Sequence, residues 1–344
     1  MLKWWHRFLV FKNIGLVVFG VLVVLLIFSF GKIYRHDELS YGATFSPKHA
    51  RALGLDWQKT FLAANDDLKI KNWRLSAYWD EVEPANGQSS WEELDWLLDQ
   101  SGSRSNNVIL AVGARLPRWP ECHLPDWTKG LTKSEREEKI LNYIAQVVNR
   151  YKDNPSIVAW QVENEPFLSH FGECPELDPD FLDQEIALVR HMVPGKPIVV
   201  TDSGELSFWI PAARRADIFG TTMYRDTYSS FLNSYVHYPI TPGFFRAKRN
   251  LASLFAKPKN WIVIELQAEP WAPVPYQNVS QAERDKTMSP QKFTEILDFA
   301  QQAGFREFYL WGVEWWYWEK TTNNRPDFWQ EAKALYGRNM ISKQ

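Results

Sequence analysis

Two stretches of the sequence combine an apolar run with an acidic end. Residues 157–162 run into Glu163-Asn164-Glu165-Pro166, and residues 261–264 run into Glu265. A buried parallel strand reads as a nearly continuous apolar run, and a proline cannot continue its hydrogen bonding. We therefore expect these carboxylates at the carboxyl ends of two strands, which is where α/β proteins carry out chemistry.

Two carboxylates that face each other across a site can cleave a glycosidic bond. One carboxylic acid protonates the leaving oxygen, and the other carboxylate attacks the anomeric carbon. Glu163 and Glu165 share side-chain parity, so either could supply one of these carboxylates, and Glu265 could supply the other. Side-chain alternation keeps Glu265 on the same strand face as Val263. Glu269, a competing carboxylate, comes later in a proline-rich stretch.

Strand and helix patterns alternate along the chain around these carboxylates. Apolar and β-branched runs predict strands at residues 41–46, 71–77, 107–112, 157–162, 197–201, 218–224, 261–265 and 307–311. Helical spacing and capping signals predict helices at residues 47–65, 91–98, 132–151, 181–192, 208–214, 242–255, 290–303 and 327–336. Eight strands, each followed by a helix, indicate an α/β protein with a (β/α)8 TIM barrel.

An apolar segment near the N-terminus predicts a membrane helix. Residues 14–30 carry no charge, and with one more residue on each side they approach the ~20 residues that span a bilayer. We expect a transmembrane signal-anchor helix at residues 13–31. The alternative is a cleaved signal peptide, but residues 29–32 lack a cleavage site of small residues.

Basic residues before this segment indicate its orientation. Lys3, Arg7 and Lys12 precede it, which favours a cytoplasmic N-terminus at residues 1–12. After a linker at residues 32–40, residues 41–344 would then form one extracytoplasmic catalytic domain, periplasmic or at the cell surface.

Composition narrows the class of partner. The net charge is −2, and no basic cluster with interleaved aromatics suggests nucleic-acid binding. The 18 Trp, 13 Tyr and 21 Phe residues supply flat rings that suit stacking on sugars. Most of these rings are expected in the core, so composition alone indicates a neutral partner. With two carboxylates that could cleave a glycosidic bond, that partner would be an oligo- or polysaccharide; the oligomeric state stays open.

The cysteines and histidines give no sign of a metal or a cofactor. Cys122 and Cys174 form no CxxC pair, and the seven histidines are scattered. In the predicted barrel the two cysteines fall in the loops after the third and fourth strands. Adjacent loops at one mouth make a disulfide between them possible, and two reduced thiols are the alternative.

The carboxyl ends of all eight strands face one mouth of a barrel, so the residues there form the predicted site. They are Arg74, Arg115, Trp119, Glu163, Asn164, Glu165, Asp202, Glu205, Tyr224, Glu265, Trp311 and Glu314. An aromatic run at residues 315–318 follows the last strand. It either packs a loop or stacks on sugar, with Trp315 as the candidate.

These motifs resemble the retaining β-glycosidases of glycoside hydrolase clan A. Residues 162–166 are similar to the clan's Asn-Glu-Pro motif, which implies that Glu165 is the acid/base and that Asn164 bonds the sugar 2-hydroxyl. Residues 262–265 look like the stretch that carries the nucleophile, here Glu265. Residues 79–95 resemble the segment after strand two in families 5, 39 and 42. Trp311 matches the sugar-platform tryptophan.

The resemblance also suggests supporting residues and alternatives. Tyr224 fits a tyrosine that bonds the nucleophile, and Arg74 fits the strand-two arginine of family 5; Arg115 and Trp119 are subsite candidates. Residues 112–115 replace the strand-three histidine of family 5, so the family stays open. The implied activity is a membrane-anchored retaining glycoside hydrolase. A transglycosylase that remodels a cell-surface glycan and a non-catalytic carbohydrate-binding barrel are the alternatives.

Overall fold

Eight parallel strands close into a barrel, as the sequence predicts. The computed structural model describes residues 15–22, 36, 38–169, 171–175 and 178–341. The strand order around the barrel is β1-β10-β9-β6-β5-β4-β3-β2. The strands are β1 (Ser40–Thr44), β2 (Asn72–Ser76), β3 (Asn107–Val112), β4 (Ile157–Val162), β5 (Ile198–Asp202), β6 (Ile218–Met223), β9 (Asn260–Gln267) and β10 (Glu307–Trp311).

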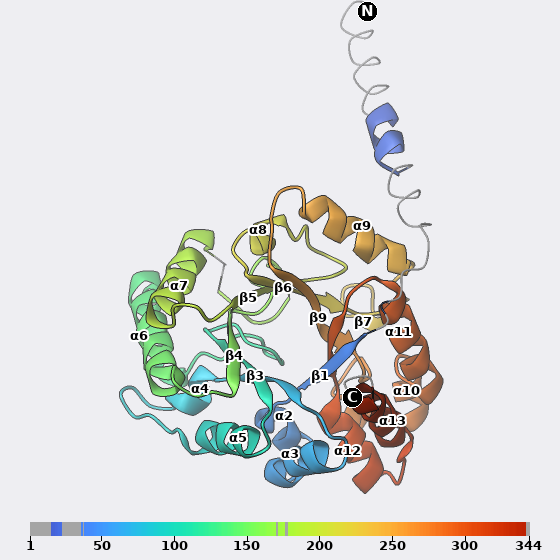
Figure 1. Cartoon of the computed structure of the whole chain (residues 1–344), viewed down its shortest axis with the longest axis horizontal. Coiled ribbons are helices and arrows are strands. Elements are labelled where there is room, and N and C mark those ends of the chain that lie inside the picture. The colour runs from blue at the N-terminus through green and yellow to red at the C-terminus, as the bar shows by residue number, and fades with distance from the viewer. Residues whose placement is uncertain (1–14, 23–35, 37, 170, 176–177, 342–344) are drawn as a thin grey trace, which may run out of the picture.

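Helices surround this barrel (Figure 1). The α-helices are α2 (Pro47–Ala52), α3 (Trp57–Asp66), α4 (Trp79–Val82), α5 (Glu92–Ser103), α6 (Lys133–Tyr151), α7 (Pro179–Met192), α8 (Ile210–Ala213), α9 (Pro242–Ala252), α10 (Gln281–Asp285), α11 (Pro290–Gln302), α12 (Val313–Thr322) and α13 (Asp327–Ile341). Two 3₁₀ turns, η1 (Asp126–Thr128) and η2 (Tyr276–Asn278), lie in loops. Thr132 and Glu135 form the predicted capping box of α6.

Side chains fill the barrel interior, so the site must lie above them at the mouth. One interior cluster consists of Ile109, Ala159, Val199, Ile262, Ile264 and Tyr309, all at most 2% exposed. These residues come from β3, β4, β5, β9 and β10. The strands are thereby held at fixed positions, and their carboxyl ends form a rigid base for polar side chains.

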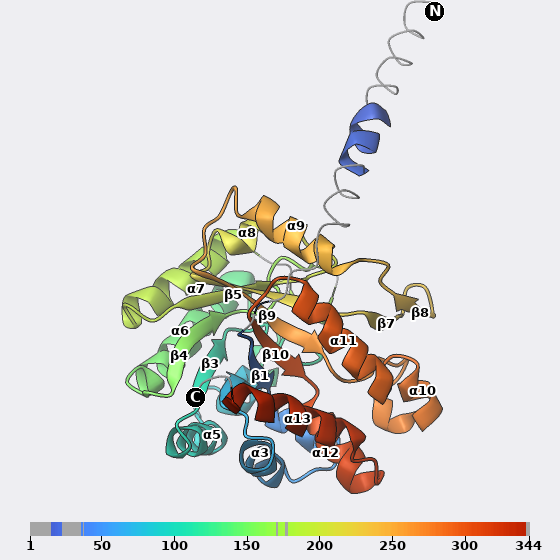
Figure 2. The ribbon, with the colours of Figure 1, turned by 45° about the vertical axis from the view of Figure 1, so that its right-hand side comes forward.

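Two local features differ from the sequence prediction. The predicted helix at residues 47–65 is split into α2 and α3 because Gly54 has a φ of +72° and Asp56 caps α3 with its side chain. An antiparallel hairpin, β7 (Asp226–Ser229) with β8 (Ser234–His237), follows β6. Figure 2 shows this hairpin beside the barrel, near α10 and α11.

The aromatic run after β10 forms a buried helix and does not line the mouth. Gly312, with a φ of +148°, turns the chain directly from β10 into α12. Trp315 is 0% exposed, and its ring centroid lies 4.3 Å from that of Phe328. Trp316 is equally buried and donates to the carbonyl of Ala268 at 2.7 Å. The prediction that Trp315 binds substrate is therefore wrong, because this side chain is part of the packing around α13.

The predicted membrane segment lies mostly outside the described residues. Of residues 13–31, only residues 15–22 are described, and they are helical and exposed. Within the described part of the chain, no helix is both long enough and apolar enough to cross a bilayer.

We expect Trp315→Ala to destabilise the protein without any sugar present. Removal of a fully buried indole costs about 3–5 kcal/mol in unfolding free energy. Trp119 is 62% exposed, so Trp119→Ala is the matched control and changes stability little. Urea unfolding followed by tryptophan fluorescence measures both values. Equal stabilities of the two variants would contradict the buried position of Trp315.

Candidate active site

A buried arginine joins three strands at the barrel mouth. Arg74 of β2 is 0% exposed. Its Nε donates to Gln161 Oε1 at 2.8 Å, and its Nη2 donates to Asn164 Oδ1 at 2.7 Å. Its Nη1 donates to Glu265 Oε1 at 2.6 Å. One planar guanidinium thereby fixes the end of β4 relative to the carboxylate on β9.

Both oxygens of Glu265 are held by donors. Oε1 accepts from Arg74, and Oε2 accepts from the Tyr224 hydroxyl at 3.0 Å. Burial, and then the charge of Glu265, raise the pKa of Tyr224 well above its ordinary value. The phenol therefore keeps its proton and donates it. These two hydrogen bonds fix the orientation of the carboxylate at position 265.

The backbone that carries Glu165 is strained. Glu163 and Glu165 have φ values of +57° and +43°, which non-glycine residues seldom adopt. The loop after β3 and strand β5 stabilise this conformation. The Asn164 N–H donates to the Arg115 carbonyl at 2.7 Å, and the Glu165 N–H donates to Thr201 Oγ1 at 2.8 Å. Such strain occurs where the surrounding structure fixes a functional geometry.

Glu163 has a structural role in this turn. Its carboxylate accepts from the backbone N–H groups of Ala114 and Arg115 at 2.7 and 2.6 Å. A Cβ added to Gly113 would lie 2.2 Å from Glu163 Oε1. Gly113, with a φ of +127°, therefore lets the loop after β3 approach the carboxylate. Glu163 thus anchors the end of β4 to the loop after β3.

Glu165 has the electrostatic surroundings of a general acid. Burial, followed by the charges of Glu265, Glu121 and Asp202, raises the pKa of Glu165 well above its ordinary value. Arg115 opposes this shift. A carboxyl group with a raised pKa stays protonated at a pH where an ordinary glutamate is ionised. The protonated Glu165 can therefore donate to a leaving oxygen.

Glu121 is a third carboxyl group at this site, and sequence reasoning missed it. It lies in the loop after β3 and is 5% exposed. Its Oε2 accepts from Asn164 Nδ2 at 3.1 Å. Burial and then the charge of Glu265 raise the pKa of Glu121 to about 8. The one available signal was its position next to Cys122, a residue that the barrel places at the mouth.

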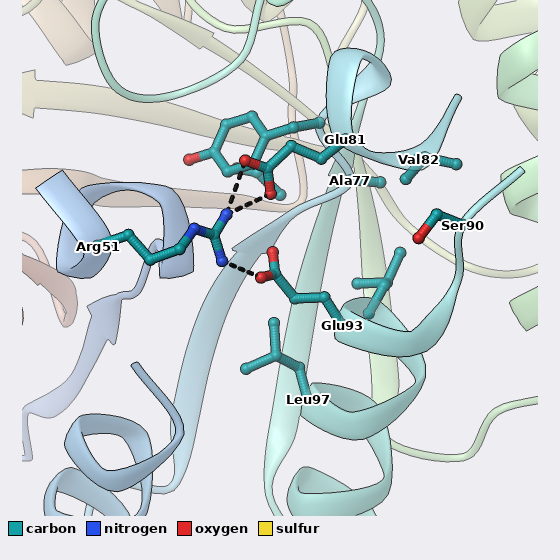
Figure 3. A pocket seen from close by; sticks show the side chains of 10 residues that line it. Arg51, Ala77, Glu81, Val82, Ser90, Glu93 and Leu97 are labelled. Atoms are coloured by element: carbon teal, nitrogen blue, oxygen red, sulfur yellow. Dashed lines mark hydrogen bonds and ion pairs between the residues drawn. The ribbon is translucent and has the colours of Figure 1, made fainter. Parts of the chain in front are cut away.

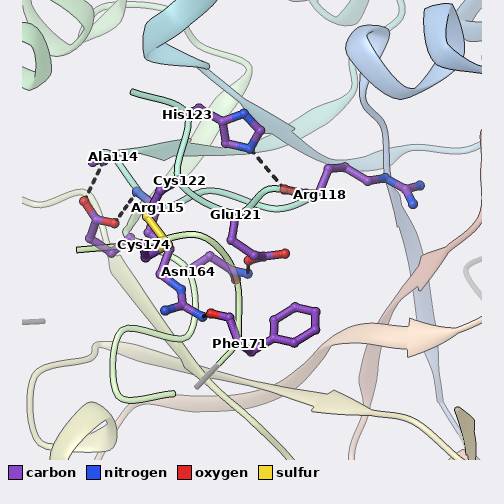
Figure 4. The surroundings of a disulfide bond; sticks show 10 residues. Ala114, Arg115, Arg118, Glu121, Cys122, His123, Asn164, Phe171 and Cys174 are labelled. Atoms are coloured by element: carbon purple, nitrogen blue, oxygen red, sulfur yellow. Dashed lines mark hydrogen bonds between the residues drawn. A yellow bond between two sulfur atoms is a disulfide. The ribbon is translucent and has the colours of Figure 1, made fainter. Parts of the chain in front are cut away.

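A disulfide between Cys122 and Cys174 ties this loop to the loop after β4. Their Cα atoms lie 5.2 Å apart. Figure 4 shows the disulfide close to Glu121, Asn164 and Arg115. The link joins two loops of the mouth and limits how far the segment that carries Glu121 can move.

A second buried ion cluster lies under Trp311. Arg118 pairs with Glu269 and with Glu314, the latter at 2.9 Å. The guanidinium carbon of Arg118 lies 4.0 Å from the centroid of the Trp311 ring, and Trp311 Nε1 donates to Glu269 Oε1 at 2.8 Å. Arg118 therefore covers one face of Trp311, so the predicted sugar stacking must use the other face. Glu269, the competing carboxylate, is bound within this cluster.

The two remaining subsite candidates differ in exposure. Arg115 is buried, and its Nη2 donates to the Phe171 carbonyl at 2.8 Å. Trp119 is 62% exposed, and its ring centroid lies 6.0 Å from that of Phe171. Arg115 thus supports the loops at the mouth, whereas Trp119 presents a free ring to solvent at the rim. Sugar contact by either residue stays a prediction.

A separate pocket lies between α2, α4 and α5. It holds about 320 Å³, and Arg51 bridges Glu81 and Glu93 within it (Figure 3). Burial raises the pKa of Glu93 to about 7. The residues that line this pocket do not include Glu165 or Glu265. No group of three or more candidate metal ligands occurs in the part of the chain that the structure describes.

Comparisons with known proteins agree with this geometry. Residues 56–175, which include Asn164 and Glu165, match the model of glycosyl hydrolase family 10. A β-galactosidase from Clostridium perfringens is 28% identical over 126 residues, which is 31% of this chain and 18% of that relative. The chain thus spans less than a fifth of the length of this curated relative.

Solved structures with the same fold come from several families. A family 10 endo-β-1,4-xylanase from Gloeophyllum trabeum has a TM-score of 0.57 at 17% identity, over 87% of this chain and 96% of its own. An exo-β-1,4-mannosidase from Opitutaceae bacterium strain TAV5 has a TM-score of 0.58 at 15% identity. The match covers 89% of this chain and 62% of the mannosidase. At these identities the likeness is one of fold. Together with the family match, it supports a glycoside hydrolase of clan A. The particular family within the clan is left open.

We expect Glu121→Gln to stabilise the protein more at pH 8 than at pH 5. Because the pKa of Glu121 is raised to about 8 in the folded state, the unfolded chain releases this proton first, and stability falls as pH rises from about 4.5 to about 8. Glutamine does not titrate and still accepts from Asn164. Thermal unfolding should show a gain of about 5 °C or more at pH 8.

Glu138→Gln is the control for this experiment. Glu138 is exposed on α6, so this variant should give the same melting temperature as the wild type at both pH values. A Glu121→Gln gain that is equal at pH 5 and pH 8 would show that Glu121 does not hold its proton in the folded protein.

Proposed function

We propose that the protein is a retaining glycoside hydrolase that cleaves β-linked glycosides by double displacement. The observation that carries this proposal is the difference between two buried carboxyl groups at one mouth. Glu265 is held by Arg74 and Tyr224 as a carboxylate. Glu165 lies near it with a raised pKa and keeps its proton. This is the division of roles that a retaining glycosidase needs.

In the first step, Glu265 attacks the anomeric carbon while Glu165 protonates the leaving oxygen. The bond from the anomeric carbon to the leaving oxygen breaks, and an ester to Glu265 forms. Arg74 and Tyr224 orient the attacking oxygen and keep it from rotating away. The leaving alcohol departs with the proton of Glu165.

In the second step, the charge change at Glu265 converts Glu165 into a base. Once Glu265 is esterified, it carries no charge, and one of the causes that raise the pKa of Glu165 disappears. Glu165 then accepts a proton from the incoming water, which attacks the anomeric carbon on the face that the leaving group vacated. The ester breaks, Glu265 regains its charge, and Glu165 is protonated again.

The relatives favour a β-linked substrate. The similar proteins include β-galactosidases, endo-β-1,4-xylanases and an exo-β-1,4-mannosidase. They differ in sugar and in exo or endo action but share the β-configuration. We therefore propose a β-linked oligo- or polysaccharide as the substrate, with its chain length set by the loops at the mouth.

We further propose that residues 13–31 anchor the protein in a membrane, with the barrel of residues 41–344 on the extracytoplasmic side. The uncharged residues 14–30 and the preceding basic residues support this placement. The disulfide at the mouth is consistent with it, because disulfides persist mainly in oxidising compartments.

Substrates with different leaving groups can distinguish the role of Glu165 from that of Glu265. We expect Glu165→Gln to slow hydrolysis of alkyl β-glycosides by roughly 10²–10⁴-fold, because these leaving groups need a proton. Release of 2,4-dinitrophenolate, which needs no proton, should still show a rapid burst. Glu265→Gln should abolish turnover of both substrate types. Stopped-flow absorbance with a panel of 2,4-dinitrophenyl β-glycosides measures the burst. Wild-type rates in Glu265→Gln would refute the proposal.

Fractionation of cells tests the anchor. The full-length protein should sediment with membranes and resist extraction by carbonate, whereas a chain that lacks residues 1–35 should not. The barrel of the full-length protein should also be cleaved by protease added outside the cytoplasmic membrane. Full-length protein in the soluble fraction would contradict the anchor and leave the proposed chemistry untouched.

A further inference from the structure

Three large apolar side chains are exposed together at the end of helix α9. Leu251, Leu254 and Phe255 are 54%, 74% and 53% exposed. Leu251 lies in the last turn of α9, and the other two lie in the loop that leads to β9. Single exposed apolar residues are ordinary on a protein surface, whereas a group of them indicates a contact with something apolar. We call these three residues the apolar patch.

The apolar patch lies on the face of the barrel opposite the mouth. Helix α9 returns the chain to the start of β9, so its last turn and the following loop lie at the amino ends of the strands. Helix α9 packs beside α11 (Figure 1). The Arg249 side chain of α9 donates to the carbonyl of Gly304, in the loop between α11 and β10. The patch is thereby joined to a second loop of the same face.

The N-terminal part of the chain meets the barrel beside this patch. His36 Nδ1 accepts from Arg306 Nε at 3.0 Å, so its Nε2 carries the proton and donates to the Gly304 carbonyl at 3.3 Å. One carbonyl oxygen therefore contacts both α9 and His36. Five residues along the chain separate His36 from residue 31, the last residue of the proposed anchor, and an extended chain covers at most about 18 Å over that length. A bilayer spanned by residues 13–31 would lie within that reach of His36.

Basic side chains surround the apolar patch. Lys257 and Lys259 follow it in the loop to β9, and both are exposed. Neither lysine forms an ion pair with a residue that the structure describes. Arg306 is exposed next to His36, and the exposed Arg214 donates to a carbonyl of the patch at 3.2 Å. Apolar side chains thus lie among cations, and this combination suits the boundary between anionic headgroups and acyl chains.

Positive charge prevails over the whole of this face. The loops that lead from helices into strands are residues 67–71, 104–106, 152–156, 193–197, 214–217, 253–259 and 303–306, and they contain ten Lys or Arg and three Asp residues. Two of the arginines pair with aspartates of adjoining helices, and Glu38 adds an exposed acid before β1. An excess of positive charge remains, although the whole chain has a net charge of −2. The face therefore complements an anionic surface.

We propose that this face rests on an anionic lipid bilayer, with the apolar patch at the boundary between headgroups and acyl chains and with Lys257 and Lys259 on the headgroups. This inference rests on the proposed anchor at residues 13–31. The mouth lies at the other ends of the strands, so Glu165 and Glu265 would face away from the membrane. The substrate would then be a glycan that extends outside the membrane, and a sugar attached to a lipid of the same bilayer would lie on the wrong side of the barrel.

A fluorescent probe on each face tests this orientation. Full-length Leu254→Cys and Phe231→Cys are labelled with nitrobenzoxadiazole, and the native cysteines do not react because they form the disulfide. Phe231 is the matched control, since it is 95% exposed in the turn between β7 and β8, which follow β6 on the mouth side. In vesicles of phosphatidylcholine and phosphatidylglycerol, we expect spin-labelled lipids to quench the probe at position 254 at least about threefold more than the probe at 231.

Paired lysine variants test the charge of the face. Lys257→Gln with Lys259→Gln should lower the quenching at position 254 at least about twofold, and so should replacement of the phosphatidylglycerol by phosphatidylcholine. Lys129→Gln with Lys286→Gln is the control, because these exposed lysines lie in the segments after β3 and β9 on the mouth side. The control pair should leave the quenching unchanged. Equal losses in both paired variants would assign the contact to overall charge and refute a role for this face.

Flotation of the same vesicles on a density gradient keeps this inference distinguishable from the proposed anchor. Protein that floats and shows equal quenching at positions 254 and 231 would refute the orientation and keep the anchor. Protein that does not float with the vesicles would refute the anchor and the orientation together. The proposed hydrolysis is measured by turnover and stands or falls separately from both.

Discussion

The buried guanidinium of Arg74 is the interaction on which the site depends. It reaches from β2 to the end of β4 and to Glu265 on β9, so three strands must be in register before its bonds form. A buried charge is tolerable only when it is paired and hydrogen-bonded, and here one carboxylate and two amide oxygens meet that need. Without Arg74, Glu265 and Asn164 would lose their common anchor, and the buried Glu265 carboxylate would keep the hydrogen bond from Tyr224 but no ion pair with Arg74.

The mouth contains more carboxyl groups than its cations can neutralise, and some of these carboxyl groups therefore hold a proton. Glu121, Glu165 and Glu205 all have a raised pKa, with burial as the main cause. Buried carboxyl groups of this kind lower the stability of the folded protein at neutral pH, and they provide proton donors at the mouth. The cluster of Arg118, Glu269 and Glu314 is separate and balances its own charges around Trp311. The same mouth thus contains two separate groups of charged residues: the balanced cluster around Arg118, and the carboxyl groups with a raised pKa.

The sequence predicted the barrel and the residues on its strands, but not those placed by loop conformation. Glu165 and Glu265 each follow an apolar run, and a run of this kind can be recognised in the sequence. Arg118 and Glu121 lie in a loop where both have a positive φ, and no pattern of apolar residues encodes such a turn. Trp315 was misplaced for a different reason. It belongs to a run of four consecutive aromatic residues, 315–318, in α12, and such a run has no periodicity that distinguishes a buried helix from a loop.

The left-handed conformations at Glu163 and Glu165 tie the chemistry to the assembly of the fold. The turn is maintained by N–H groups from the loop after β3 and by Thr201 of β5. An isolated β4 would have no reason to adopt it, because these partners belong to the loop after β3 and to β5. Glu165 therefore takes this conformation where β3, β4 and β5 lie side by side. The conformation of the segment that carries Glu165 thus depends on the elements on both sides of β4 and not on the sequence of β4 alone.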